Sequence, residues 1–168
     1  MAKAAHAIDR VSRSIGAVAA WAALSMVFLQ TAVVLARHLF GLASVFAQEL
    51  TLYAHAVLIT LGAAAALSRD RHVPIDAAVK TARPRTRAWI EIAGVLLLLL
   101  PFCAAILWFS LDYVAAAWAA LEGSTETAGV PARFALKTLI PLFALLLALQ
   151  GAASLLRALD VLRRRDEA

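Results

Sequence analysis

The chain has 168 residues, of which 63% are hydrophobic and 16% are charged, and its formal net charge is +5. Soluble globular domains carry about 25% charged residues, so this composition excludes an ordinary water-soluble domain and indicates a membrane protein. The basic sequence pI of about 10.1 is also found in nucleic-acid-binding proteins. Here the basic residues follow a membrane topology, described below, so nucleic acid is not an expected partner.

Four stretches without Asp, Glu, Lys or Arg are long enough to cross a bilayer as helices. They hold 23, 19, 20 and 19 residues. At a helical rise of ~1.5 Å per residue, about 20 residues match a hydrocarbon core about 30 Å thick. The sequence therefore predicts an all-α membrane protein, with residues 1–168 forming a single four-helix membrane domain. The predicted spans are about 14–36, 46–68, 89–113 and 136–158.

The first predicted span contains small residues and one amide. Gly16, Ala19 and Ala23 allow another helix to approach closely. Gln30 lies in the second half of this span, where we expect its amide to hydrogen-bond to another helix. Arg37 ends the span at a short turn.

The second predicted span begins with a polar stripe. Ser44 is suited to cap the helix N-terminus. After it, Gln48, Thr51, Leu52 and His55 follow at i, i+3, i+4 and i+7 spacing, which puts them on one helix face. We expect His55 to be a hydrogen-bonded packing residue rather than a ligand.

Glu49 lies beside this stripe at the outer edge of the membrane, and an ionisable group at membrane depth is a functional-site candidate. We expect Glu49 to make a structural ion pair or a subunit contact, and a proton-carrying role is the alternative. Lys137 opens the fourth span at the same level, so a direct Glu49–Lys137 pair would neutralise both charges. There are two alternatives: Arg37 takes the place of Lys137, or residues of a partner subunit complete the pair.

The first long polar stretch follows the second span. Apolar residues repeat at helical spacing over 74–82, while Asp76 and Lys80 lie on the opposite face at a spacing suited to an ion pair. The sequence predicts a short amphipathic helix over about 74–82 that lies in the inner headgroup region. His72 has no second His or Cys at ligand spacing, so no metal site is expected.

The third and fourth predicted spans carry few polar residues. Pro101 interrupts the third span and predicts a kink. Cys103 is the single cysteine, so an internal disulfide is excluded. A turn-rich outer loop is predicted at about 115–135. The fourth span begins at Lys137 and carries Gln150 near its end.

The distribution of basic residues predicts the orientation of the chain in the membrane. If the N-terminus is cytoplasmic, 13 of the 16 Lys and Arg residues fall on the cytoplasmic side, and only Arg37, Arg133 and Lys137 fall outside. This asymmetry follows the positive-inside rule. We therefore expect both termini in the cytoplasm.

Four short motifs occur in an order that resembles one family. They are Arg37-x-x-Phe40, Gln48-Glu49-Leu50, His72-Val73-x-Ile75-Asp76 and Lys137-x-x-Ile140-Pro141. Together with four spans in this orientation, they resemble the small membrane subunit of TRAP (tripartite ATP-independent periplasmic) transporters. The Leu149-Gln150-Gly151 ending of the last span is also similar.

The resemblance implies a multi-pass protein of the bacterial inner membrane that serves sodium-coupled uptake of organic acids or related solutes. It implies a stable heterodimer with a large membrane subunit, which carries the substrate, and transient contact with a periplasmic solute-binding protein. Membrane lipids are the other expected partner. The small subunit is then a non-transporting scaffold partner. Candidate structural or subunit-interface residues are Arg37, Gln48, Glu49, His55, His72, Asp76, Lys137 and Gln150.

Two other functions compete with this interpretation. A small proton-coupled exporter would use Glu49 as its proton carrier, which requires the carboxylate deep in the membrane. A haem-binding membrane anchor of an oxidoreductase would need two histidines at matched depth, and only His55 lies within a predicted span. We expect no enzyme activity, no catalytic residues and no cofactor.

Overall fold

The computed structural model describes residues 2–68 and 84–166. Within these ranges every regular element is a helix: α1 (Ala2–Phe40), α2 (Val45–Ser68), α4 (Pro84–Gly94), the π-helical segment η1 (Val95–Leu99), α5 (Leu100–Ala119) and α6 (Arg133–Asp166). The elements α4, η1 and α5 continue into one another as one span, so four helices are long and apolar enough to cross a membrane. The predicted all-α fold with four spans is confirmed. The predicted interfacial helix at 74–82, with His72 and Asp76, lies outside the described residues.

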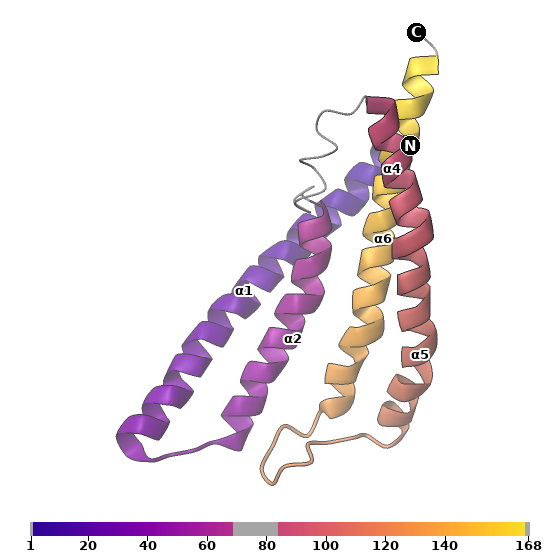
Figure 1. The fold of residues 1–168 in the computed structure, drawn as a ribbon. Coiled ribbons are helices and arrows are strands. Elements are labelled where there is room, and N and C mark those ends of the chain that lie inside the picture. The colour runs from indigo at the N-terminus through magenta and orange to yellow at the C-terminus, as the bar shows by residue number, and fades with distance from the viewer. Residues whose placement is uncertain (1, 69–83, 167–168) are drawn as a thin grey trace.

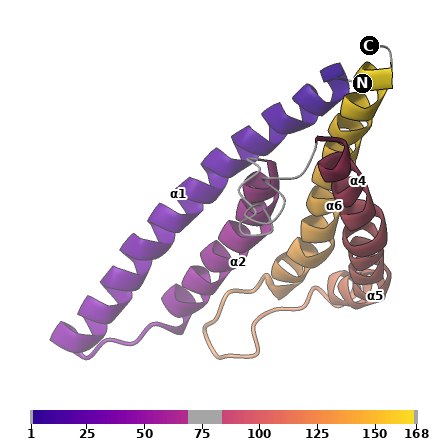
Figure 2. The same cartoon turned by 45° about the horizontal axis from the view of Figure 1, so that its top comes forward.

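The four spans form two helical hairpins that meet along α6. Helix α1 lies beside α2, the α4–η1–α5 span lies beside α6, and α6 also contacts α1 and α2 (Figures 1 and 2). The start of α1 and the end of α6 lie at one end of the bundle. The connections at 41–44 and 120–132 lie at the other end, which we call the loop end. Because four is an even number of crossings, both ends of the chain lie at the same end of the bundle.

Small residues let the α6 backbone approach its neighbours. Ala144, Ala153 and Ala158 are buried on this helix. Ala144 and Leu147 pack against Cys103 of α5, which is 1% exposed and forms the centre of the larger apolar cluster. Close contact between small residues is the usual basis of helix association in membranes, because lipid is as apolar as the side chains. Helix α6 is therefore the central helix of the fold.

The faces of α5 that turn away from α6 are strongly apolar. Trp108 and Phe109 are 75% and 79% exposed, and Leu97 of η1 is 73% exposed. Side chains of this kind are stable on an open surface only where lipid or another protein covers them. Their exposure fits a helix that lies in a bilayer.

The third span contains a π-helical turn just before Pro101. The backbone N–H of Leu100 donates to the carbonyl of Val95, five residues back, instead of four. Proline has no N–H to donate and its ring crowds the preceding turn, so a widened turn accommodates it within a continuous helix. The structure thus has a π-helical turn over Val95–Leu99 next to the position at which Pro101 predicts a kink.

Local sequence explains the turns at the loop end. Gly41 follows α1 with a φ of +66°, the left-handed conformation that glycine adopts without a steric penalty. The Ser44 hydroxyl accepts a hydrogen bond from the backbone N–H of Ala47 at 3.3 Å, so Ser44 caps α2 as predicted. After α5, Leu121 turns the chain with a φ of +45°, and the N–H of Glu122 donates to the Ala117 carbonyl at 3.0 Å.

Candidate functional site

Glu49 is the residue through which the loop at 120–132 holds the first hairpin. It lies near the start of α2 and is partly buried. The Ser124 hydroxyl donates a hydrogen bond to Glu49 Oε1, and the backbone N–H of Val130 donates to Glu49 Oε2 at 2.6 Å. Both carboxylate oxygens therefore have donors from a loop that lies more than 70 positions further along the chain. Hydrogen bonds to an ionised carboxylate are roughly twice as strong as neutral ones.

Gly129 makes this close approach of the loop possible. A Cβ atom at position 129 would lie 2.6 Å from Glu49 Oε2 and would overlap the Ser124 side chain. No real side chain keeps such a contact without moving its neighbours. Glycine is therefore needed at position 129, because the side chains of Ser124 and Glu49 occupy the space that a Cβ atom would fill.

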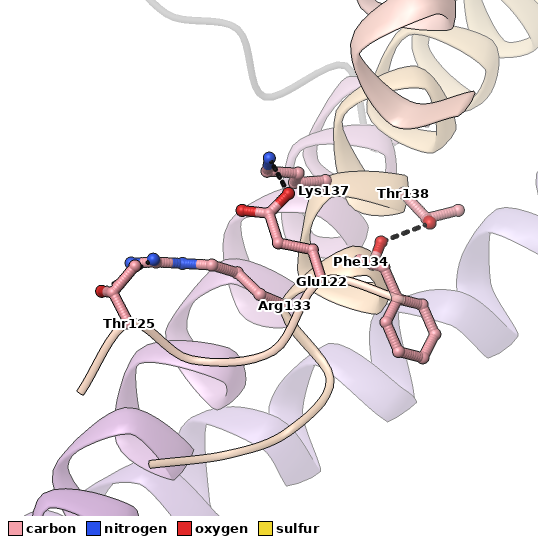
Figure 3. A network of polar contacts seen from close by, with 6 residues as sticks. All are labelled: Glu122, Thr125, Arg133, Phe134, Lys137 and Thr138. Carbon is pink, nitrogen blue, oxygen red and sulfur yellow. Dashed lines mark hydrogen bonds and ion pairs between the residues drawn. The ribbon is translucent and has the colours of Figure 1, made fainter. Parts of the chain in front are cut away.

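Lys137, in the first turns of α6, has a separate partner. Its Nζ atom lies 2.5 Å from Glu122 Oε2 (Figure 3) and 3.9 Å from the ring centroid of Tyr113. The Lys137 side chain is 14% exposed and that of Glu122 is 34% exposed, so the ion pair is shielded on the lysine side. The Tyr113 ring adds a cation–π contact from α5.

The predicted direct pair between Glu49 and Lys137 is wrong. Each side chain lies at the loop end as expected, but the loop supplies Glu49 with an O–H and an N–H donor and supplies Lys137 with the Glu122 carboxylate. The turn-rich loop predicted at about 115–135 was the only feature of the sequence that pointed to these partners. Equal depth in the membrane does not decide which way a side chain turns around its helix axis.

An aromatic and hydroxyl network ties the end of α5 to the start of α6. Trp118 Nε1 donates to Thr138 Oγ1 at 2.9 Å, and the Thr138 hydroxyl donates to the Phe134 carbonyl, also at 2.9 Å (Figure 3). The rings of Trp118 and Phe134 meet edge to face with centroids 4.6 Å apart. Arg133 Nη1 donates to Thr125 Oγ1 at 3.0 Å. The sequence does not indicate this network, because its members come from two helices and the loop between them and share no regular spacing.

The other predicted site residues do not join this cluster. Arg37 is exposed at the end of α1. Gln48 and His55 line a groove between α1 and α2 together with Gln30. Gln150 of α6 is completely buried. The structure thus brings Glu49 and Lys137 to one loop and places the remaining described candidates elsewhere in the bundle.

A second cavity, of about 540 Å³, lies between α2, α5 and α6. Its walls are mainly apolar, and its polar lining near the loop end comes from Tyr113, Arg133 and Lys137. In the part of the chain that the structure describes, no three His, Cys, Asp or Glu side chains gather as a metal site. The polar contacts at the loop end join the helices to the loop, which is a structural role.

These features define a class: a helical protein of four membrane spans whose polar contacts at the loop end hold two hairpins together. A family model described as "Tripartite ATP-independent periplasmic transporters, DctQ component" matches residues 10–161. The match covers most of the 168 residues, so the chain belongs to the DctQ family of TRAP transporter components. The resemblance that the sequence motifs indicated is confirmed. No curated protein and no solved structure matches the chain significantly.

Proposed function

We propose that this chain is the small permease subunit of a TRAP-type secondary transporter and acts as a non-transporting scaffold partner of the large membrane subunit. The family match over residues 10–161 is the observation that carries the proposal. The complete system imports organic acids or related solutes with sodium, and a periplasmic solute-binding protein delivers the substrate. The chain belongs in the bacterial inner membrane, with both termini in the cytoplasm.

The geometry of Glu49 supports a structural role. A carboxylate that carries protons through a transporter has to exchange them with water on both sides of the membrane. Glu49 lies at the loop end, and both of its oxygens accept hydrogen bonds from the loop. This arrangement favours a scaffold over the proton-coupled exporter that uses Glu49.

Reconstitution tests the proposal. The chain is placed in vesicles alone, with its large membrane subunit, or with both the large subunit and the solute-binding protein, under a sodium gradient. We expect solute uptake in the complete system and none with this chain alone. Saturable uptake by the chain alone, under a sodium or a proton gradient, would overturn the scaffold role.

A variant separates the exporter from the scaffold within the same assay. Glu49→Gln retains the size of the side chain and removes its proton-carrying group. We expect the complete transporter with Glu49→Gln to keep its substrate turnover per assembled complex, because Glu49 holds a loop in place. If turnover per complex disappears while assembly is unchanged, Glu49 takes part in transport itself.

A further inference from the structure

A groove of about 540 Å³ separates α1 and α2 towards the loop end, and we call it the α1–α2 groove. Apolar walls come from Met26, Val27 and Leu52. Its polar lining comes from both helices and consists of Gln30, Thr31, Gln48, Thr51 and His55. Five hydrogen-bonding side chains on one side of two apolar helices require a physical explanation.

Two of these side chains are satisfied within their own helix. The Thr31 hydroxyl donates to the Val27 carbonyl at 2.8 Å, and the Thr51 hydroxyl donates to the Ala47 carbonyl at 3.0 Å. Hydroxyls commonly bond in this way to the carbonyl four residues back. Thr31 and Thr51 therefore need no partner from outside the chain.

The other three side chains have no such solution. Gln30, Gln48 and His55 are exposed, and none of their side chains makes a hydrogen bond within the part of the chain that the structure describes. An amide carries two donors and one acceptor, and a neutral imidazole carries one of each. These groups have to bond to something that reaches the α1–α2 groove from outside.

Their depth limits what that partner is. Gln30 lies 10 residues before the end of α1 at Phe40, and His55 lies 10 residues after the start of α2 at Val45. Because α1 and α2 run antiparallel side by side, the two residues lie at one level, and ten residues correspond to about 15 Å of helix. Counted from the charged residues Arg37 and Glu49 at the outer edge of the predicted spans, Gln30 and His55 lie seven and six residues deep. This is about 9–11 Å of helix, which puts both side chains below the level of the lipid headgroups and among the lipid tails.

We propose that the α1–α2 groove receives a helix of the large membrane subunit, which hydrogen-bonds to Gln30 and His55 through polar side chains. This inference rests on the proposed function, since that function supplies a second membrane chain. Lipid tails offer no hydrogen bonds, whereas Ser, Thr, Asn, Gln and His on a neighbouring helix do. Gln48, nearer the loop end, extends the same polar contact towards the membrane surface.

Photo-crosslinking in the assembled complex tests the location of this interface. A benzoylphenylalanine side chain is introduced at position 30 or 55, and at position 109 as the control. Phe109 is 79% exposed on α5, in the other hairpin, and is already aromatic. We expect illumination to join positions 30 and 55 to the large subunit, and position 109 to give no such product.

The outcomes separate the inference from the proposed function. If the large subunit does not co-purify with the unsubstituted chain, the proposed function fails and the inference fails with it. If the two chains co-purify but positions 30 and 55 give no cross-link to the large subunit, only the inference is overturned. Cross-links from both positions only to lipid or only to a second copy of this chain overturn it in the same way.

Substitution measures how much the polar contacts contribute. Hydrogen bonds between transmembrane helices contribute about 0.6 kcal/mol on average. The double variant Gln30→Leu with His55→Leu should therefore weaken association with the large subunit roughly eightfold, and each single change roughly threefold. His55→Gln keeps a hydrogen-bonding group and should keep most of the affinity. Phe28→Leu, on the other side of α1, is the control. Equal affinities for the double leucine variant and the control would contradict the inference.

Discussion

The carboxylate of Glu49 on α2 accepts a hydrogen bond from the backbone N–H of Val130, with 2.6 Å between Oε2 and N. These residues lie 81 positions apart in the chain, and their contact attaches the loop after α5 to the first helical hairpin. The donor is a backbone group, so no substitution at Val130 other than proline removes it. Glu49 is therefore the position at which substitution can test the attachment.

Removing the Glu49 carboxylate should loosen the loop. We expect Glu49→Ala to lower the melting temperature of the detergent-purified protein, because the Ser124 hydroxyl and the Val130 N–H both lose their acceptor. Glu49→Gln should lower it less, since an amide oxygen still accepts one bond. Glu126→Gln in the same loop is the control. If Glu49→Ala and Glu126→Gln have the same melting temperature, the attachment does not contribute to stability.

Gly129→Ala tests the close approach of the loop without touching a charge. Its new methyl group would overlap Ser124 and lie 2.6 Å from Glu49 Oε2, so the loop has to move away from α2. Overpacking of this kind costs about 1–3 kcal/mol. At Gly123 the nearest atom to an added Cβ is 3.6 Å away, an ordinary contact, so Gly123→Ala should have little effect. Equal stability of the two variants in a thermal unfolding assay would refute this account.

A double-mutant cycle separates the observed ion pair from the expected one. We predict coupling between Glu122→Gln and Lys137→Gln, because these side chains contact each other directly. We predict additive effects for Glu49→Gln and Lys137→Gln, whose side chains bond to different parts of the loop. The measurement is the unfolding free energy of the purified chain for each single and double variant. Coupling between Glu49 and Lys137, with none between Glu122 and Lys137, would show that Lys137 pairs with Glu49 instead of Glu122.

Gly151 on α6 should be intolerant of larger side chains. A Cβ at this position would lie 2.5 Å from Leu99 Cδ2 and 3.5 Å from Val95 Cγ1, both in the π-helical segment. Gly151→Leu should therefore destabilise the bundle by at least about 1–3 kcal/mol. Gly94 has helical dihedral angles and nothing within 4 Å of an added Cβ, so Gly94→Leu should be neutral or stabilising. Thermal unfolding compares the stabilities of the two variants. If Gly94→Leu lowers stability as much as Gly151→Leu does, the close packing of Gly151 against the π-helical segment is not the cause.

Cysteine labelling tests the orientation. In a Cys103→Ser background, Ala43→Cys lies in the connection at the loop end and Arg163→Cys lies near the end of α6. Both positions are exposed. A membrane-impermeant maleimide added from the periplasmic side should label position 43 and leave position 163 unlabelled. The opposite pattern would place the loop end in the cytoplasm.

Local properties of the sequence were sufficient for the spans and for the start of α2. A charge-free run of about 20 residues forms a helix in a membrane whatever its neighbours are, because every backbone group has to be satisfied within the span. The cap at Ser44 is also local, since its acceptor and the N–H of Ala47 are three positions apart. For the same reason, the level of Glu49 and Lys137 along the bundle could be predicted from their places in the chain.

The partners of these two charges were decided only by the tertiary structure. Depth follows from position along a helix, whereas pairing depends on rotation around the helix axis and on the path of the loop. That path results from the left-handed turn at Leu121 and from the close approach that Gly129 allows. It brings Ser124 and Val130 to Glu49, and Glu122 to Lys137, so the two opposite charges have separate partners. Such contacts have no periodic signal in the sequence, because they depend on how the loop folds back and on how the two hairpins pack against one another.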